Sequence, residues 1–129
     1  MPVSVSPYQG REDVLYFRFE EQWTLEDLFQ VLDSVLGYYE NRGPDQRLSS
    51  ITDLRAASFA PTNIVSGLSR IGRHPAVNHI ARGTPVVIGG KGINHALAQV
   101  FSRLFLELHF TDTLEAAEAI IAEKERIPP

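Results

Sequence analysis

The sequence contains no cysteine among its 129 residues. This absence excludes disulfide bonds, thiolate metal ligands and a cysteine nucleophile. No stretch of the chain approaches the ~20 consecutive apolar residues that span a bilayer. Residues 1–8 also lack the basic start and apolar run of a signal peptide. We therefore expect a cytoplasmic protein that does not insert stably into a membrane.

An excess of basic charge is also missing, because the formal net charge is −4. Binding to phosphate backbones needs a basic surface, so this balance argues against nucleic acid as a partner. The length is that of one domain. We expect a single domain over residues 1–129, with a leading strand and turn at 1–12 and a tail at 126–129.

The common nucleotide-binding motifs are incomplete. Gly89-Gly-Lys-Gly92 lies between an expected strand and an expected helix, where backbone amides can bind an anion. A P-loop needs Ser or Thr after the lysine, and the dinucleotide pattern needs a third glycine where His95 stands. Two interpretations stay open: a tight turn that needs glycine, which we favour, and a weak anion site at Gly89, Gly90, Lys91 and Gly92.

Metal-binding and hydrolase signatures are absent as well. The four histidines show no H-E-x-x-H spacing, and no cysteine can complete a zinc site. No G-x-S-x-G elbow is present. We therefore expect neither a metal nor a cofactor. The histidines are His74, His79, His95 and His109.

Hydrophobic spacing predicts strands that alternate with helices. Strands are expected at residues 13–20, 48–54, 84–89 and 108–110, with a short additional strand at 3–5. Four helices follow the main strands in turn. This order predicts an α/β fold with a layered sheet of about four to five mostly parallel strands and about four helices.

Polar residues mark the helix ends. Thr24 is the expected N-cap of the first helix, with Asp27 completing a capping box, and Gly43 suits its C-terminal end. Thr62 is the expected cap of the second helix. Asp112, three residues before Glu115, is expected to cap the last one.

The strand at 48–54 and the helix after it place polar groups at the carboxyl edge of the sheet, where open α/β folds keep their functional residues. Asp53 could act there as a general base or metal ligand. The alternative is a structural carboxylate bound by backbone amides or by Arg55, which we favour because no second carboxylate is close in sequence.

One basic cluster follows this passage. We interpret it as a solvated face, with an acidic partner or a lipid headgroup as the alternative. Its members are Arg70, Arg73, His74, His79 and Arg82.

The chain resembles the STAS domain superfamily, the fold of anti-sigma-factor antagonists. The family passage D-L-x-x-V-x-F-[ILM]-D-S-[ST]-G-L lies over residues 53–64, where Asp53, Leu54 and Phe59 match. Thr62 stands where the family has its phosphorylated serine. The resemblance thus implies that Thr62 is a regulatory site, and a phosphate there would add a charge of about −2.

Two features distinguish this chain from that pattern: Pro61 replaces the aspartate before the phosphoacceptor, and the following glycine is missing. The chain is more similar to SpoIIAA-like domains of unassigned role. That similarity is carried by residues 14–19, 23–25 and 110–117.

The leading functional hypothesis is a non-enzymatic protein-interaction or regulatory module that uses the strand-to-helix edge. A protein partner is expected, and self-association as a homodimer stays open. The interaction or regulatory residues of this hypothesis are Asp53, Ser58, Thr62 and Asn63.

A second hypothesis is a carrier of a lipid or small hydrophobic ligand, with an apolar cavity beside Trp23, Phe29, Phe101 and Phe105. Aromatic residues on helices are more often plain core, so it ranks second. A third is an enzyme.

The enzyme hypothesis needs two polar groups that converge on one edge, such as Asp53 with Lys91 or with His95.

Overall fold

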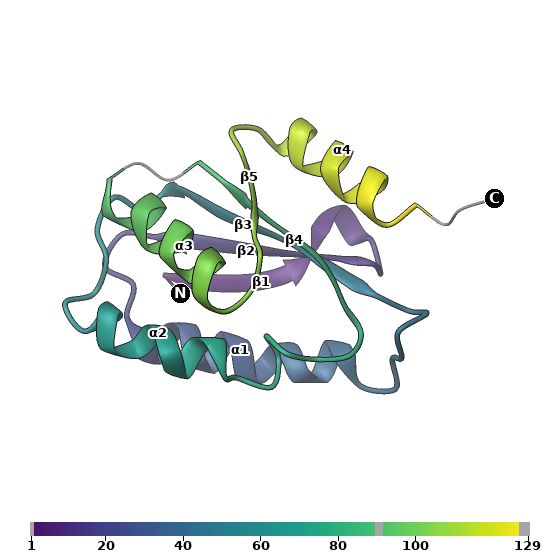
Figure 1. Cartoon of the computed structure of the whole chain (residues 1–129), viewed down its shortest axis with the longest axis horizontal. Helices are drawn as coiled ribbons and strands as arrows, with labels where there is room; N and C mark the ends of the chain where they lie inside the picture. Colours follow the sequence, from purple (N-terminus) through teal and green to yellow (C-terminus); the bar gives the residue numbers. More distant parts are fainter. Residues whose placement is uncertain (1, 90–91, 127–129) are drawn as a thin grey trace.

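The computed structural model describes residues 2–89 and 92–126, which form five strands, four α-helices and one short 3-10 helix (Figure 1). The strands are β1 (Val3–Pro7), β2 (Val14–Glu20), β3 (Leu48–Ala56), β4 (Arg82–Ile88) and β5 (His109–Thr111). The helices are α1 (Leu25–Tyr39), α2 (Ile64–Gly72), α3 (Ile93–Leu104) and α4 (Leu114–Lys124), with the 3-10 helix η1 at Tyr8–Gly10.

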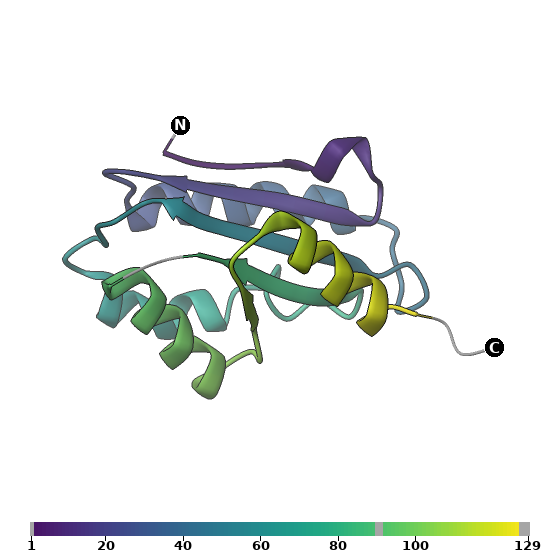
Figure 2. The same ribbon diagram turned by 90° about the horizontal axis from the view of Figure 1, so that it is seen from above.

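The strands form one twisted sheet in the order β1-β2-β3-β4-β5 (Figure 2). β1 pairs with β2 antiparallel, and every later pair is parallel. The mostly parallel α/β sheet predicted from the sequence is therefore confirmed. The carboxyl ends of β2, β3 and β4 meet at one edge of the sheet, next to the starts of the helices that follow.

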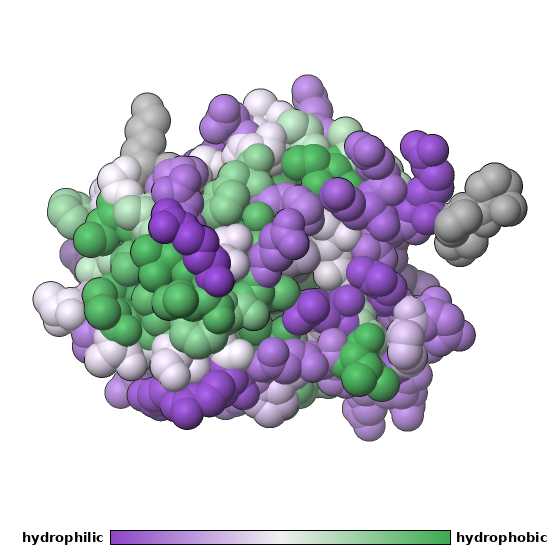
Figure 3. Space-filling model, in the orientation of Figure 1, coloured by the Kyte–Doolittle hydropathy of each residue, from purple (hydrophilic) through white to green (hydrophobic). Residues whose placement is uncertain are grey.

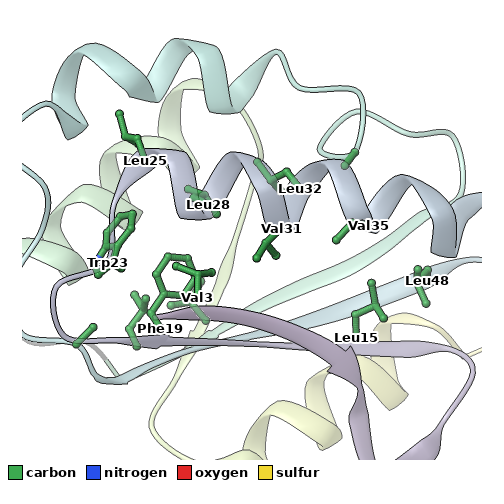
Figure 4. Close-up of a cluster of buried hydrophobic side chains, with 14 of the residues drawn as sticks. Val3, Leu15, Phe19, Trp23, Leu25, Leu28, Val31, Leu32, Val35 and Leu48 are labelled. Carbon is green, nitrogen blue, oxygen red and sulfur yellow. The ribbon is translucent and has the colours of Figure 1, made fainter. Parts of the chain in front are cut away.

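The larger core lies between the sheet and the layer of α1, α2 and α3. α1 contributes a buried stripe at three- and four-residue steps, as expected for a helix with one face on a sheet. At one end of this core the rings of Phe19 and Trp23 meet edge to face, with centroids 4.9 Å apart (Figure 4).

The smaller core lies on the opposite face of the sheet, under α4 and η1. Ala117 and Ile121 of α4 pack there with Ile51, Val86 and Ile88 of the central strands. Ile51 and Ile88 are fully buried because helices cover both faces of the parallel strands. Side chains alternate along β3, so neighbouring residues of that strand serve different cores.

The capping box at the start of α1 is confirmed: Thr24 accepts from the Asp27 amide, and Asp27 accepts from the Thr24 amide. The expected role of Gly43 at the other end is wrong. α1 ends at Tyr39, and the residue with left-handed backbone is Asn41, at φ 66°. Asparagine tolerates this conformation, so the helix ends before glycine is reached.

Two other predicted caps are wrong by one residue. Asn63 rather than Thr62 holds the N-cap position of α2, and no side chain caps that helix. The Ile64 amide donates to the Pro61 carbonyl (3.1 Å), so a separate turn precedes the helix. At α4 the cap is Thr113 rather than Asp112, with the Thr113 hydroxyl accepting from the Ala116 amide at 3.0 Å.

The strand ends also differ from the prediction. β3 continues two residues beyond Leu54, to Ala56, because β2 still pairs with it there. β4 begins at Arg82 instead of Thr84, opposite Leu48. Asp53 therefore lies inside β3 and not at its end.

Candidate functional site

The loop between β3 and α2 is held from two sides at the carboxyl edge of the sheet. The indole N–H of Trp23 donates to the Phe59 carbonyl at 3.0 Å. The buried Asn94 side chain donates to the same carbonyl (3.1 Å) and to the Ala57 carbonyl (2.8 Å). The Phe59 ring is nevertheless 69% exposed. A fixed backbone thus presents an exposed aromatic ring.

Asn94→Ala is expected to lower the free energy of unfolding by about 2 kcal/mol, because it leaves the carbonyl of the buried Ala57 without its donor. It should also shift Trp23 emission to longer wavelength, since Trp23 is the single tryptophan and bonds the same loop. Urea unfolding and fluorescence measure both effects. Asn63→Ala is the matched control, because the exposed Asn63 makes no capping bond and its loss should cost under about 0.5 kcal/mol. An unchanged stability of Asn94→Ala contradicts this account.

Three of the predicted interaction residues lie in this loop. The amide and hydroxyl of Ser58 both donate to the Glu21 carboxylate, the hydroxyl at 2.9 Å. Thr62 and Asn63 are exposed in the turn before α2. Ser58 is therefore tied to the chain between β2 and α1, while Thr62 and Asn63 face solvent.

Asp53, the fourth of those residues, lies on the other face of the sheet. Its carboxylate accepts from the Arg55 guanidinium at 3.0 and 2.8 Å, from the Arg55 amide at 3.0 Å and from the Tyr16 hydroxyl at 2.5 Å. Asp53 is only 5% exposed, whereas Arg55 reaches solvent. This pairing with Arg55 and a backbone amide is the structural alternative given for Asp53 from the sequence.

The partners of Asp53 set its protonation. Burial by itself would raise the pKa of Asp53, but the hydrogen bonds from Arg55 and Tyr16 outweigh it and hold the pKa at about 2. Burial and the neighbouring carboxylate raise the pKa of Tyr16. A carboxylate this well satisfied is a poor general base near neutral pH.

The structure does not bring Asp53 and His95 together. His95 lies on the side of α3, with its ring edge-on to Phe110 at 5.4 Å. Phe110 packs with the core on the α1–α3 face, opposite the face that holds Asp53. The other pairing in the enzyme hypothesis involves Lys91, which lies outside the described residues.

The glycine-rich segment is described only at its ends. Gly89 and Gly92 have φ of 66° and 64°, which favour glycine. A Cβ on Gly89 would also lie 2.5 Å from Cγ of Arg55, and the Gly89 amide donates to the Thr111 carbonyl at 3.0 Å. Gly90 and Lys91 lie outside the described residues. The anion site stays a prediction.

An apolar surface lies over the two helices next to the loop. We call it the α2–α3 face and define it by Val65, Ile93, Val100, Leu104 and Phe105, all exposed. Hydrophobic side chains gather over α3 and toward α2 (Figure 3). A Cβ on Gly72 would lie 2.5 Å from the Phe105 ring, so this ring packs closely on α2.

Four of the five members of the predicted basic cluster contact other side chains or the backbone. Arg70 lies over the Phe29 ring at 4.6 Å, and Nε2 of His74 lies 2.8 Å from the Asp33 carboxylate. The other two residues with contacts are His79 and Arg82. His79 stacks on Tyr39 at 4.3 Å, and Arg82 donates to the Val77 carbonyl at 3.0 Å.

A largely apolar cavity of about 210 Å³ lies between the sheet and the layer of α1, α2 and α3. Of the four aromatic residues expected beside such a cavity, Trp23 and Phe101 line it. Phe29 instead packs near Arg70 and His74, and Phe105 lines an adjoining polar pocket. The sequence therefore indicated the right layer but only half of these lining residues.

Within residues 2–89 and 92–126, no helix is long and apolar enough to cross a membrane. In the same part of the chain, no three His, Asp or Glu side chains are grouped so that they could hold a metal ion.

Comparison with known proteins adds information on the fold. No protein-family model matches the chain, and no curated protein does so either. An uncharacterised DUF3478-family protein from Shewanella loihica PV-4, described as having a SpoIIAA-like fold, superposes with a TM-score of 0.64 at 15% identity, over 92% of this chain and 91% of that one.

A second solved structure, an anti-sigma-factor antagonist (STAS) domain protein from Planctomyces limnophilus, superposes with a TM-score of 0.55 at 13% identity. The match covers 92% of this chain and 97% of that one. Identities this low show the fold alone. Together with the strand order and helix placement, they show that this chain has a STAS-like, SpoIIAA-like fold.

Proposed function

We propose that this protein is a non-enzymatic interaction module that binds a protein partner through Phe59 and the α2–α3 face. The observation that carries this proposal is the Phe59 ring, exposed on a loop whose backbone Trp23 and Asn94 fix. Aromatic side chains on preorganised backbone are typical anchors of protein interfaces, because little conformational entropy is lost on binding.

The α2–α3 face supplies the apolar area around such an anchor. Val65 of α2 is 70% exposed and Leu104 of α3 is 66% exposed, although both side chains are apolar. A scattered exposed apolar residue is ordinary, but several on two adjacent helices mark an interaction surface.

Charge indicates the kind of partner. The sequences of α2 and α3 contain no acidic residue and one arginine each, Arg70 and Arg103. The chain as a whole carries a net charge of −4, so its acidic groups lie elsewhere. A partner with an apolar centre and an acidic rim would complement this surface.

A two-fold dimer through the α2–α3 face is less favourable than such a partner. In a two-fold interface the same patch meets itself, so neither copy would bring an acidic residue from α2 or α3 to complement the arginines of these helices. Self-association is therefore the competing outcome.

Thr62 and Asn63 lie in the same loop as Phe59 and would fall within this interface. A phosphate on Thr62 would place a charge of about −2 next to α2 and α3, whose sequences contain arginines and no acidic residue. Such a modification would weaken the binding of an acidic partner through repulsion between like charges. Thr62 is therefore the proposed regulatory position.

The double substitution Val65→Ser with Leu104→Ser is expected to weaken the affinity for the partner at least tenfold. The free energy of unfolding should change by less than about 1 kcal/mol, because both side chains are exposed. Tagged protein recovered from its native cells, with partner stoichiometry determined by quantitative mass spectrometry, measures the loss.

The matched control is Ile80→Ser, which removes a 71% exposed isoleucine from the connection between α2 and β4. The control should keep the partner. Equal recovery of a stoichiometric partner by all three proteins would contradict the assignment of the α2–α3 face.

A further inference from the structure

The central strand of the sheet has short polar side chains where a bulky core is expected. Ser50 and Thr52 of β3 face the α1–α3 layer and line the cavity. Thr52 lies opposite Phe17 of β2 and Val87 of β4. Both polar residues are only half-buried, although strands flank them on each side. Strands covered by helices on both faces usually present Val, Ile or Leu.

These short side chains form the floor of the 210 Å³ cavity. Its roof comes from the inner sides of the helices, with Leu32 of α1, Leu68 of α2 and Phe101 of α3 among the lining residues. Protein interiors are normally packed with few voids larger than a water molecule. An apolar cavity of about 150 Å³ accommodates benzene, so this one has room for roughly eight carbon atoms.

A second hollow of opposite character adjoins the cavity. A polar pocket of about 470 Å³ lies beside the first half of β4, and Arg82, Pro85 and Leu106 line both spaces. β5 pairs only with Val86–Ile88, so this part of β4 has no strand on its outer side. The opening is therefore a consequence of the short β5.

The polar pocket has more basic than acidic side chains. Arg47, Arg82 and Lys124 line it together with His109, and Glu107 is the acidic residue among the lining. Arg47 is paired with Glu125 at 3.0 Å. Nη1 of Arg82 donates one hydrogen bond, to the Val77 carbonyl. A guanidinium has five N–H donors, so this bond engages only one of them. Within the described residues Arg82 forms no ion pair.

We propose that the two hollows form one binding site for a single-chain amphipathic anion. The apolar tail lies in the cavity over Ser50 and Thr52, and the acidic head lies in the polar pocket against Arg82 and Lys124. The apolar cavity lining contains no carboxylate among the described residues. At the polar pocket, Glu107 is part of the lining, and the Glu125 carboxylate binds two lining residues, Arg47 at 3.0 Å and the Thr84 hydroxyl at 2.6 Å. The head is therefore assigned to Arg82 and Lys124 rather than to Arg47. This proposal is independent of the proposed protein interaction, because it uses the interior of the α1–α3 layer.

The test compares three eight-carbon probes that differ in the head group: octanoate, octyl phosphate and neutral 1-octanol. Isothermal titration of the full chain should show octanoate or octyl phosphate binding at 1:1, at least tenfold tighter than 1-octanol. The tighter of the two anions identifies a carboxylate or a phosphate head. Equal affinity for 1-octanol would overturn the role of the polar pocket, and no binding of any probe would overturn the site.

Variants locate the two parts of the site. Arg82→Gln should weaken the anions about tenfold and change 1-octanol by less than twofold, because glutamine keeps a polar N–H donor but removes the positive charge that binds the head. Thr52→Leu fills the floor of the cavity and should weaken all three probes at least tenfold. Ser50→Val serves the same purpose if Thr52→Leu does not fold. Arg18→Gln, an exposed change on β2, should alter no affinity beyond twofold. Anion binding that survives both cavity-filling variants contradicts the proposal.

Discussion

Asp53→Asn is expected to lower the free energy of unfolding by about 2 kcal/mol at pH 7. The native carboxylate has a pKa of about 2, against 3.8 for an unperturbed aspartate. The difference between these values corresponds to about 2 kcal/mol of stabilisation of the charged form. Asparagine keeps the shape of the side chain but loses the charge that binds Arg55. Urea unfolding of both proteins measures the difference.

The same substitution changes the dependence of stability on pH. The folded pKa of Asp53 lies below the unfolded one, so its contribution is complete above about pH 4 and is lost as the pH falls from about 4 to 2. Asp53→Asn should therefore remove one component of acid destabilisation in this range. Asp45→Asn, at an exposed aspartate, is the control and should change stability by less than about 0.5 kcal/mol. An acid profile of Asp53→Asn that matches the native protein contradicts this account.

Gly83→Ala is expected to lower the free energy of unfolding by about 3 kcal/mol. Gly83 is buried at the start of β4, where a Cβ would lie 2.9 Å from the Ser49 amide nitrogen and 3.1 Å from the Leu48 carbonyl carbon. It would also strike the Ser49 hydroxyl, which accepts from the Thr84 amide. These are backbone atoms and a short buried side chain, so relief requires β3 and β4 to separate.

Gly37→Ala provides a control of opposite sign. Gly37 lies on the exposed side of α1, and nothing lies within 4 Å of its added Cβ. Alanine is a better helix former, so this change should raise stability by about 0.5 to 1 kcal/mol. Thermal unfolding of both variants separates the two effects. A Gly83→Ala protein as stable as the native one would show that the β3–β4 contact is not as tight as described.

Features that depend on local sequence were predictable. The Thr24–Asp27 capping box needs only residues three apart and is present as expected. The second predicted cap failed because Thr62 and Asn63 are adjacent residues that both suit the position, and the turn closed by Pro61 decides between them.

The candidate site was predictable only in part, because its key contacts join distant segments. Trp23 and Asn94 meet at the Phe59 carbonyl, 36 and 35 residues away along the chain. The face to which Asp53 points follows from its register against β2 and β4, which the sequence does not display. The polar residues in Leu48-Ser-Ser-Ile-Thr-Asp53 were the available signal for both the cavity floor and the buried carboxylate.

The most direct test of the interaction function is site-specific photo-crosslinking in native cells. A photoreactive phenylalanine analogue at position 59 samples the proposed interface, and the same analogue at the exposed Ala119 of α4 samples a surface outside it. We expect one discrete adduct with a different protein from position 59 and none from position 119. Adducts at position 119 alone, equal adducts from both positions, or crosslinks only between copies of this chain would contradict the proposed function.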